Sequence, residues 1–305
     1  MAYIKKQVEN GRVYYILVRS KREGEKVIQE VIRRFTDLDE VLDYCKKHKI
    51  KPPKVELIER HLAERIEKYL NKLNSIRPFP KQTLESLKKK FEIEATYHSN
   101  AIEGNRLSLK ETYLVLEKGM TIGGRSFKEH LEATNHREAI HFVEELIKEK
   151  RRITESDILN LHAIILGNIN PEWAGFYRNG QVRITFAEHK PPNYKLVPKL
   201  MGEVVELLNK KVRGTKAIEV AAEIHHKLVF IHPFWDGNGR LARLLANIKL
   251  MQAGFPPIVL KKRNRLSYYN ALEKADKGDL GPLTSMIARE VEHTLKEYIE
   301  AFEES

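Results

Sequence analysis

The side chains best suited to chemistry lie in one short run, His-Pro-Phe-Trp-Asp-Gly-Asn-Gly-Arg-Leu-Ala-Arg, at residues 232–243. His232 is the one side chain of this run that takes up a proton near neutral pH, so it is the candidate general base. Asp236 offers a carboxylate of the kind that holds Mg²⁺ against phosphate oxygens. Arg240 and Arg243 are three residues apart, so on a helix both can reach one polyphosphate. Together these residues predict nucleotidyl or phosphoryl transfer.

The same run contains the elements of an anion site. An apolar helix over about 220–230 delivers the chain to the run, and Gly237, Asn238 and Gly239 free the backbone to turn. The apolar spacing that follows predicts a new helix beginning near Asn238. The first turn of a helix presents unpaired N–H groups and the positive end of the helix dipole. A phosphate group is therefore expected at this turn.

The run resembles the motif of the Fic (AMP-transferring) family, His-x-Phe-x-Asp/Glu-Gly-Asn-Gly-Arg-x-x-Arg, at every fixed position. The resemblance covers about residues 80–295. It implies a Mg²⁺-dependent protein adenylyltransferase that moves AMP from ATP to a Ser, Thr or Tyr hydroxyl of a protein target or of itself. The roles that it implies are general base for His232, buried anchor for Phe234, Mg²⁺ ligand for Asp236, cradle of the α- and β-phosphates for Gly237, Asn238 and Gly239, β-phosphate contact for Arg240 and γ-phosphate contact for Arg243.

Two flanking segments resemble further parts of the family's site. The stretch 181–186 alternates in polarity, which predicts a short hairpin; it resembles the flap that clamps a target by strand addition, a backbone-read mode. Downstream, a second segment resembles the region that closes over adenine. The flanking residues assigned to the nucleotide site are Val182, Arg183, Ile184, Thr185, Tyr268 and Tyr269. Some relatives carry Asn where this chain has Asp276, so no ligand is assigned there.

An upstream segment, Ser-Asn-Ala-Ile-Glu-Gly-Asn at residues 99–105, fits the family's inhibitory-helix pattern. A Glu103 carboxylate paired with Arg243 would occupy the γ-phosphate position and leave ATP in an unreactive pose. Ser99, four residues earlier on a helix, is expected to steady that carboxylate. These residues predict low basal transfer, relieved by Glu103→Gly.

Three alternatives remain open at this stage. The same site can remove AMP, with Glu103 orienting water near a metal on Asp236, as some inhibited relatives do. A nucleotide-sensing or nucleic-acid-binding regulator would use ATP only as a ligand. The histidines at 189, 225, 226 and 232 also invite a zinc site, although adjacent histidines point to different helix faces and no cysteines assist.

The elements that must position these residues are mostly helical. Apolar spacing predicts helices at about 57–73, 81–97, 108–117, 128–149, 155–167, 197–210, 216–230, 238–253, 265–276 and 280–301. The first 35 residues differ: runs 3–8, 12–19 and 26–33 predict strands, with a turn at Asn10-Gly11, before a short helix over 38–47. Prolines at 52 and 53 mark a boundary. We therefore expect a mainly α, Fic-type helical domain with a β-hairpin flap over 55–305, with its inhibitory helix at about 96–104 and its catalytic core at about 125–295. A small β-hairpin/helix module over 1–54 precedes it.

The composition indicates which kinds of partner and which compartment to expect. The net charge is +12, and residues 1–54 hold 14 Lys and Arg against 8 Asp and Glu, which favours an anionic partner. Nucleic-acid contact through 1–54 is one possibility, target docking another and a solvated appendage a third. No apolar run is long enough to cross a bilayer, and the single cysteine, Cys45, cannot form an internal disulfide. We therefore expect a cytoplasmic protein without membrane contact, and a homodimer is possible because relatives often dimerise.

Overall fold

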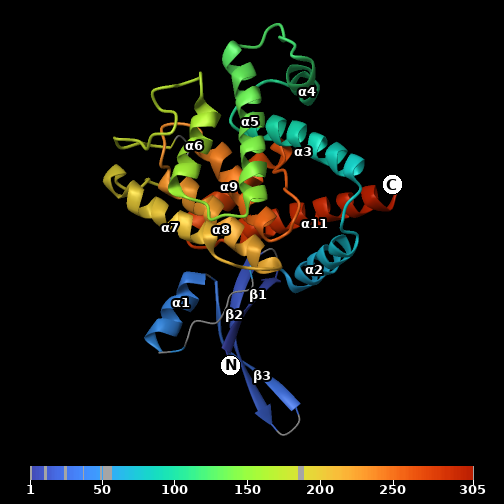
Figure 1. Ribbon diagram of the computed structural model, residues 1–305. Helices are drawn as coiled ribbons and strands as arrows, with labels where there is room; N and C mark the ends of the chain where they lie inside the picture. Colours follow the sequence, from blue (N-terminus) through green and yellow to red (C-terminus); the bar gives the residue numbers. More distant parts are fainter. Residues whose placement is uncertain are drawn as a thin grey trace.

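A helical body and a small N-terminal module make up the computed structural model, which describes residues 2–9, 12–23, 26–36, 38–48, 50, 57–184 and 189–304 (Figure 1). Its helices are α1 Leu38–Lys47, α2 Arg60–Ser75, α3 Lys81–Ile102, α4 Leu109–Lys118, α5 Phe127–Glu149, α6 Glu155–Leu166, α7 Val197–Asn209, α8 Thr215–Ile231, α9 Asn238–Gln252, α10 Arg265–Asp276 and α11 Gly281–Glu303, with short 3₁₀ turns at Tyr194–Leu196 and Lys262–Asn264. The expected mainly α class is confirmed.

The N-terminal module is a three-stranded antiparallel sheet with one helix against it. Strands β1 Ala2–Glu9, β2 Arg12–Glu23 and β3 Lys26–Phe35 pair in the order β1-β2-β3. The strands and α1 lie where the sequence predicts them, because alternating β-branched residues form one apolar face. That face packs on α1 in a core of its own, built from Ile4, Tyr15, Leu17, Phe35, Val41 and Cys45. The turn at residues 10–11 and the boundary at 51–54 lie outside the described residues.

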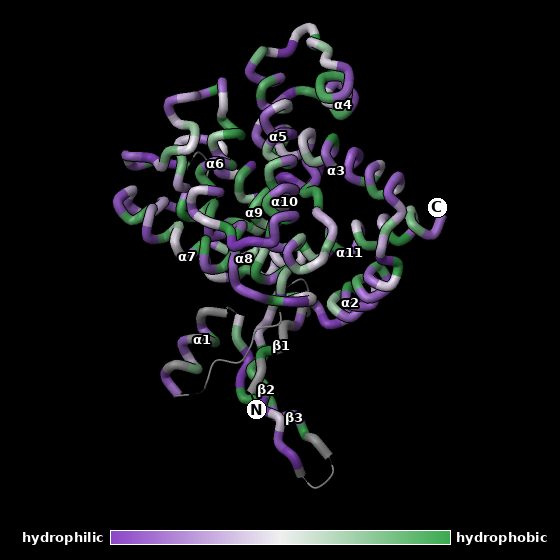
Figure 2. Tube along the Cα trace, in the orientation of Figure 1, coloured by the Kyte–Doolittle hydropathy of each residue, from purple (hydrophilic) through white to green (hydrophobic). Residues whose placement is uncertain are grey.

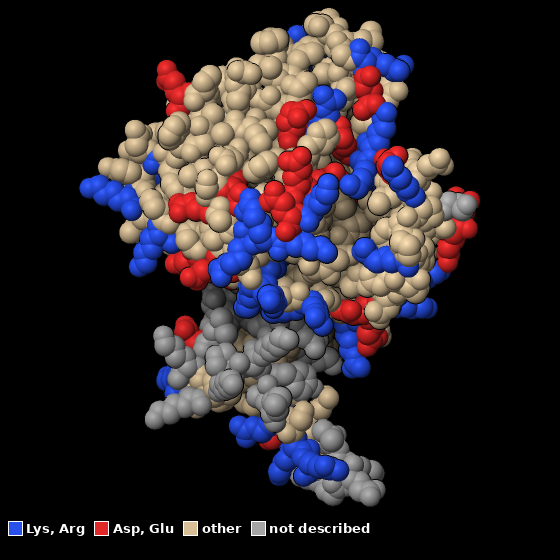
Figure 3. Space-filling model, viewed as in Figure 1, with Lys and Arg blue, Asp and Glu red and all other residues tan. Residues whose placement is uncertain are grey.

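Where the structure describes them, the basic side chains of this module are exposed, and Figure 3 shows Lys and Arg on the described part of the hairpin and along the adjacent edge of the helical body. Two tyrosines of β2, Tyr14 and Tyr15, contact other side chains. Tyr15 is buried in the module's core and its hydroxyl donates to Asp279 Oδ2 at 3.2 Å, while the Arg34 guanidinium lies 3.9 Å from the ring centre of Tyr14. Neither ring is presented for base stacking, so nucleic-acid contact through this module stays a prediction.

The helical body is built around α8 and α9. Nearly every residue of α9 is buried, and Figure 2 shows its hydrophobic stretches in the middle of the body. Helices α2, α10 and α11 cover one side of this pair, and α5, α6 and α7 cover the other. The polar residues of α9 are therefore enclosed by protein, so each of them needs a partner or a ligand. Among the described residues, no helix is both long enough and apolar enough to cross a membrane.

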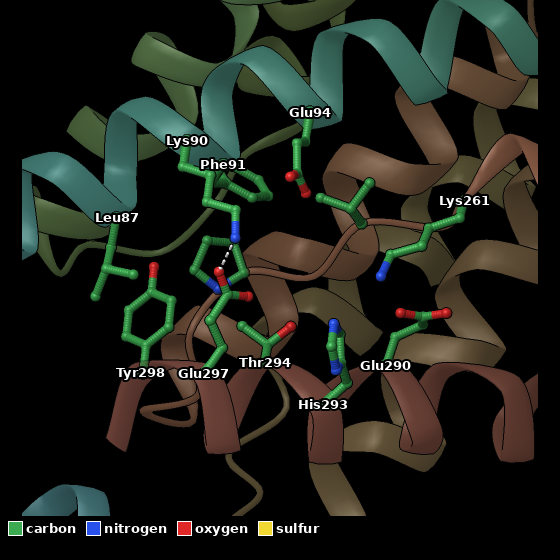
Figure 4. Close-up of a pocket in the computed structure, with 12 residues that line it drawn as sticks. Leu87, Lys90, Phe91, Glu94, Lys261, Glu290, His293, Thr294, Glu297 and Tyr298 are labelled. Atoms are coloured by element: carbon green, nitrogen blue, oxygen red, sulfur yellow. Dashed lines mark hydrogen bonds and ion pairs between the residues drawn. The ribbon is translucent and has the colours of Figure 1, made fainter. Parts of the chain in front are cut away.

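Helix α3 extends five residues beyond the predicted 81–97 and ends at Ile102. Its first half packs on α11 through a crevice of only about 30 Å³, which Figure 4 shows between Phe91 of α3 and Thr294 of α11. An ion pair between Lys90 and Glu297 closes the crevice. That volume admits about one water molecule, so the crevice does not hold a nucleotide. The packing of α3 on α11 around this crevice holds α3 in place, and the last turn of α3 carries the expected inhibitory residues.

Candidate active site

His232 ends α8 in a left-handed conformation, with φ 49° and ψ 59°, which is uncommon for a residue other than glycine. Its backbone N–H donates to Leu228 O at 2.9 Å. Its carbonyl accepts a hydrogen bond from Arg178 Nε at 2.8 Å. The helix end and Arg178 therefore fix the loop at the residue predicted to be the base.

The imidazole of His232 is neutral over the ordinary pH range, because burial lowers its pKa to about 4. A neutral imidazole accepts a proton, as a general base must. We expect the ring resonances of His232 to stay unchanged between pH 8 and pH 5.5, measured by an NMR titration and assigned by their loss in His232→Ala. A midpoint near the ordinary value of about 6.5 would contradict this expectation.

The loop after His232 is held rigid by its own side chains. Asn238 accepts from the N–H of Phe234 at 3.0 Å and donates to its carbonyl at 2.9 Å. The Phe234 ring is fully buried and stacks on His162, whose Nε2 lies 3.0 Å from the Asp236 carbonyl. Asn238 was expected to contact phosphate, but in this structure its side chain forms hydrogen bonds with the Phe234 backbone inside the loop. The backbone amides at the start of α9 are left as the anion-binding groups.

Gly237 and Gly239 are glycines for different reasons. Gly237 has φ 78°, a conformation that other residues rarely adopt. A Cβ atom on Gly239 would lie 2.3 Å from Oε1 of Glu103. The first turn of α9 has no side-chain cap, and the Glu103 carboxylate rests directly against it. A carboxylate thus already occupies the place where an anion is expected.

Arg243 is the partner of that carboxylate. Its Nη2 donates to Glu103 Oε1 at 2.7 Å and to the Ser99 carbonyl at 2.9 Å, and its Nε donates to Ser99 Oγ at 2.9 Å. Burial lowers the pKa of this guanidinium, but the charges and hydrogen bonds of Glu103 and Tyr268 together outweigh burial, and the pKa is raised overall. Ser99 was expected to steady Glu103; its hydrogen bonds instead hold Arg243. The difference arises because α9 packs against α3 where Ser99 faces it.

Arg240 lies beside the predicted metal ligand. Its guanidinium is 2% exposed, with Nη2 at 3.3 Å from Asp236 Oδ1 and Nη1 at 3.6 Å from Glu132 Oε1. Glu132 Oε2 accepts from Asn105, two residues after Glu103, at 2.8 Å. The turn that carries Glu103 is thereby connected to Arg240. Asp236 keeps its side chain 38% exposed at the edge of this cluster.

The remaining predicted residues fall in two groups. Residues 181–184 form no strand, and Thr185 lies outside the described residues, so the flap hairpin is not seen. A β-strand needs a neighbouring strand to pair with. This segment is instead held by Gln181 Nε2, which donates to Pro191 O at 2.8 Å.

The two tyrosines assigned to the nucleotide site differ in their surroundings. Tyr268 is buried with its hydroxyl 3.2 Å from His225 Nε2, whereas Tyr269 is partly exposed and its hydroxyl donates to Ile102 O at 3.3 Å.

The histidines considered for zinc are engaged separately. His226 Nε2 lies 2.9 Å from Asp276 Oδ1, and His189 Nε2 lies 2.8 Å from the Phe230 carbonyl. His225 contacts a tyrosine hydroxyl, as described above. In the part of the chain that the structure describes, no three His, Cys, Asp or Glu side chains gather as a metal site. The zinc alternative therefore has no geometric support.

Arg178 is a functional residue that the sequence did not reveal. It is 2% exposed and donates to the carbonyls of His232, Gly180 and Pro192 at 2.6–2.8 Å. It thus joins both ends of the segment 180–192 to the catalytic loop. The run Tyr-Arg-Asn-Gly at 177–180 was the only local signal, and it does not identify a partner 54 residues away.

We expect Arg178→Lys to lower both stability and transfer. Lysine keeps the charge but lacks the fork that reaches several carbonyls, and each buried acceptor left unpaired costs about 1–3 kcal/mol. Urea unfolding should show a loss of about 2 kcal/mol or more, and transfer should fall with it. The exposed Arg213→Lys, at a position with no assigned role in the site, is the control. Unchanged unfolding and transfer in Arg178→Lys would contradict this role.

Comparison with known proteins agrees with this geometry. The Fic/DOC family model matches residues 152–250. The solved structure of Fic-1 from C. elegans aligns with a TM-score of 0.71 and 35% identity, covering 79% of this chain and 72% of that one. The chain belongs to the Fic/DOC family. A Fic-domain signalling protein from Bacteroides thetaiotaomicron is similar too, with a TM-score of 0.71, 28% identity and 79% and 97% coverage.

Curated relatives of this Fic protein carry an activity in their names. Protein adenylyltransferase Fic of Nematostella vectensis is 39% identical over 81% of this chain and 58% of its own length. Protein adenylyltransferase fic-1 of Caenorhabditis elegans is 42% identical over 68% of this chain and 41% of its own length. The chain thus spans about half the length of the curated relatives that it matches.

Proposed function

We propose that this protein is an adenylyltransferase that moves AMP from ATP to a hydroxyl group of a protein. The observation that carries the proposal is the first turn of α9, where the Arg243 guanidinium holds the Glu103 carboxylate against Gly239, and the charge of that carboxylate acts on the neutral His232. The names of the curated relatives support it.

In the proposed reaction, the acceptor oxygen attacks the α-phosphorus of ATP. The bond between that phosphorus and the bridging oxygen to the β-phosphorus breaks, and pyrophosphate leaves. The hydroxyl proton passes to the imidazole of His232; since its Nδ1 is buried, Nε2 is the nitrogen that receives it. The α9 amides, Arg240 and Arg243 stabilise the phosphate charge.

Mg²⁺ fits this site as an ion shared with the nucleotide. Asp236 Oδ1 already accepts from the Gly237 N–H at 2.6 Å, and the side chain is partly exposed. One protein carboxylate with phosphate oxygens and waters is the usual environment of Mg²⁺. When bound, the ion would neutralise charge on the leaving pyrophosphate. In our proposal Asp236 holds it and Arg240 keeps Asp236 in place.

Glu103 is proposed to inhibit the same site. Its carboxylate occupies Arg243 and lies against Gly239, so a γ-phosphate and this carboxylate compete for one guanidinium. Like charges in one site repel, which leaves a bound triphosphate displaced. Low basal transfer follows from this competition.

Removal of AMP from a protein is the second candidate function. It is favoured by the position of Glu103, whose partly exposed carboxylate lies at the phosphate-binding turn where it can orient a water molecule. Mass spectrometry of an AMP-bearing protein incubated with the chain and Mg²⁺ tests it. Loss of AMP with wild type and not with Glu103→Gly would support removal.

The test of the main proposal is transfer of label from ATP labelled at the α-phosphorus, with Mg²⁺ present. Wild type, Glu103→Gly and Glu103→Gly/His232→Ala are compared on the chain itself and on added proteins. Label on protein in Glu103→Gly and not in the double variant would support transfer. No protein label in any variant, with ATP bound in all, would reject it.

A further inference from the structure

Exposed aromatic rings gather beside the catalytic loop. Trp173, Phe176 and Trp235 are 39%, 66% and 37% exposed, and we call them the aromatic shelf. The two indole rings lie 6.3 Å apart between centroids. With Glu172 and Asn179 they line an open groove of about 680 Å³, within the range of about 300–1,000 Å³ typical of ligand pockets. Large rings left in water at one place indicate a binding surface.

The shelf includes a residue of the same loop that carries the proposed base. Trp235 lies between His232 and Asp236, and its ring is so close to Gly180 that a Cβ there would lie 3.0 Å from it. The other face of the loop is the α9 turn, where Glu103 and Arg243 mark the phosphate position. The groove therefore includes Trp235, three residues along the chain from the histidine that the acceptor hydroxyl must reach.

The chain next to Trp235 is held in place, which lowers the entropic cost of binding at the shelf. Phe234, next to Trp235, is fully buried between His162 and Tyr177, with ring centroids 3.6 and 5.3 Å apart respectively. The Tyr177 hydroxyl donates to Glu155 at 2.8 Å. Fixed aromatic rings of this kind are typical of the residues that dominate protein–protein binding.

The charge at the rim of the groove indicates the chemistry of the segment that binds there. Glu172 is exposed at the rim of the groove and forms no ion pair with any described residue. An unpaired carboxylate beside aromatic rings favours a segment that carries both an apolar side chain and a cation. Building on the proposed transfer activity, we propose that the aromatic shelf holds the acceptor protein. Its ligand is an extended segment with an aromatic or large aliphatic residue close to the modified hydroxyl and a Lys or Arg beside it.

The chain offers a direct probe of this surface. It has two tryptophans, and both belong to the shelf, so tryptophan emission excited at a wavelength that spares tyrosine reports on the shelf alone. We would titrate the full chain with synthetic peptides that carry Thr in an Ala background. Three peptides differ at the two residues that flank Thr. The first has Phe and Lys there, the second has Ala and Lys, and the third has Phe and Glu.

We expect saturable emission changes with the Phe and Lys peptide, with about tenfold weaker binding when Phe becomes Ala. Phe176→Ala should weaken binding by a similar factor, whereas Phe127→Ala, an exposed aromatic on α5, should not. Glu172→Lys should make the Phe and Glu peptide the better ligand. In transfer assays with Glu103→Gly, Phe176→Ala should raise KM for the peptide and leave the dissociation constant for ATP unchanged.

Equal emission changes for all peptides, or a Phe preference that survives Phe176→Ala, would overturn the proposal. The fluorescence titration needs neither ATP nor catalysis. Failure of transfer with normal peptide binding would therefore count against the proposed function and not against the aromatic shelf. Normal transfer to peptides without any peptide preference would count against the aromatic shelf alone.

Discussion

Glu103→Gly should raise AMP transfer by about ten- to a hundredfold. A charge-assisted hydrogen bond contributes about 1.5–3 kcal/mol, and each 1.4 kcal/mol is a factor of ten. In the present structure that bond joins Glu103 and Arg243, so its removal frees the guanidinium for the γ-phosphate. Glycine also clears the space over Gly239. The measurement is the initial rate of protein labelling from α-labelled ATP at saturating Mg²⁺.

Two further variants separate charge from bulk in that experiment. Glu103→Gln keeps the size of the side chain and removes its charge, so we expect a rate between those of wild type and Glu103→Gly. Ser99→Ala leaves the carboxylate and removes one contact of Arg243, so we expect a smaller change than for Glu103→Gly. Equal labelling by wild type and Glu103→Gly, with ATP bound equally by both, would show that Glu103 does not inhibit.

The sequence predicts the start of α9 well because its signals are local. The helix expected at 238–253 is observed at Asn238–Gln252, since glycines and apolar spacing define its start within a few residues. The same holds for the strands and for α1. Helix α3 joins the helices expected at 81–97 and about 96–104 into one, and distant contacts hold its last turn: Asn100 Nδ2 donates to Glu132 O at 3.0 Å, and Ser99 binds Arg243.

Contacts between distant elements are what the sequence does not reveal. Arg178 reaches His232 only because the segment after α6 folds back over the end of α8. Glu132 is one of many glutamates on an amphipathic helix until α9 places Arg240 beside it. The hydrogen bonds that a motif side chain forms are likewise not visible in the sequence. Asn238 has the type and position of a phosphate ligand, yet its side chain closes the loop on Phe234.

His232→Ala should lower transfer by about 10²–10⁴-fold, the usual contribution of a positioned general base. Alanine removes the proton acceptor at a position where the backbone is fixed by Arg178, so the loop is expected to keep its shape. ATP binding should survive, because the α9 amides, Arg240 and Arg243 do not depend on the imidazole. The measurement pairs labelling rates with the dissociation constant for ATP, both in the Glu103→Gly background.

His226→Ala provides the matched control for that loss. His226 lies on the same helix and binds Asp276 instead of facing the loop, so its removal should leave the labelling rate within about twofold. A large loss in both variants would point to damage of α8 rather than to missing base chemistry. Labelling that persists in His232→Ala would mean that another group takes the proton. Loss of labelling in His232→Ala alone, with ATP still bound, separates a transferase from a protein that only senses the nucleotide.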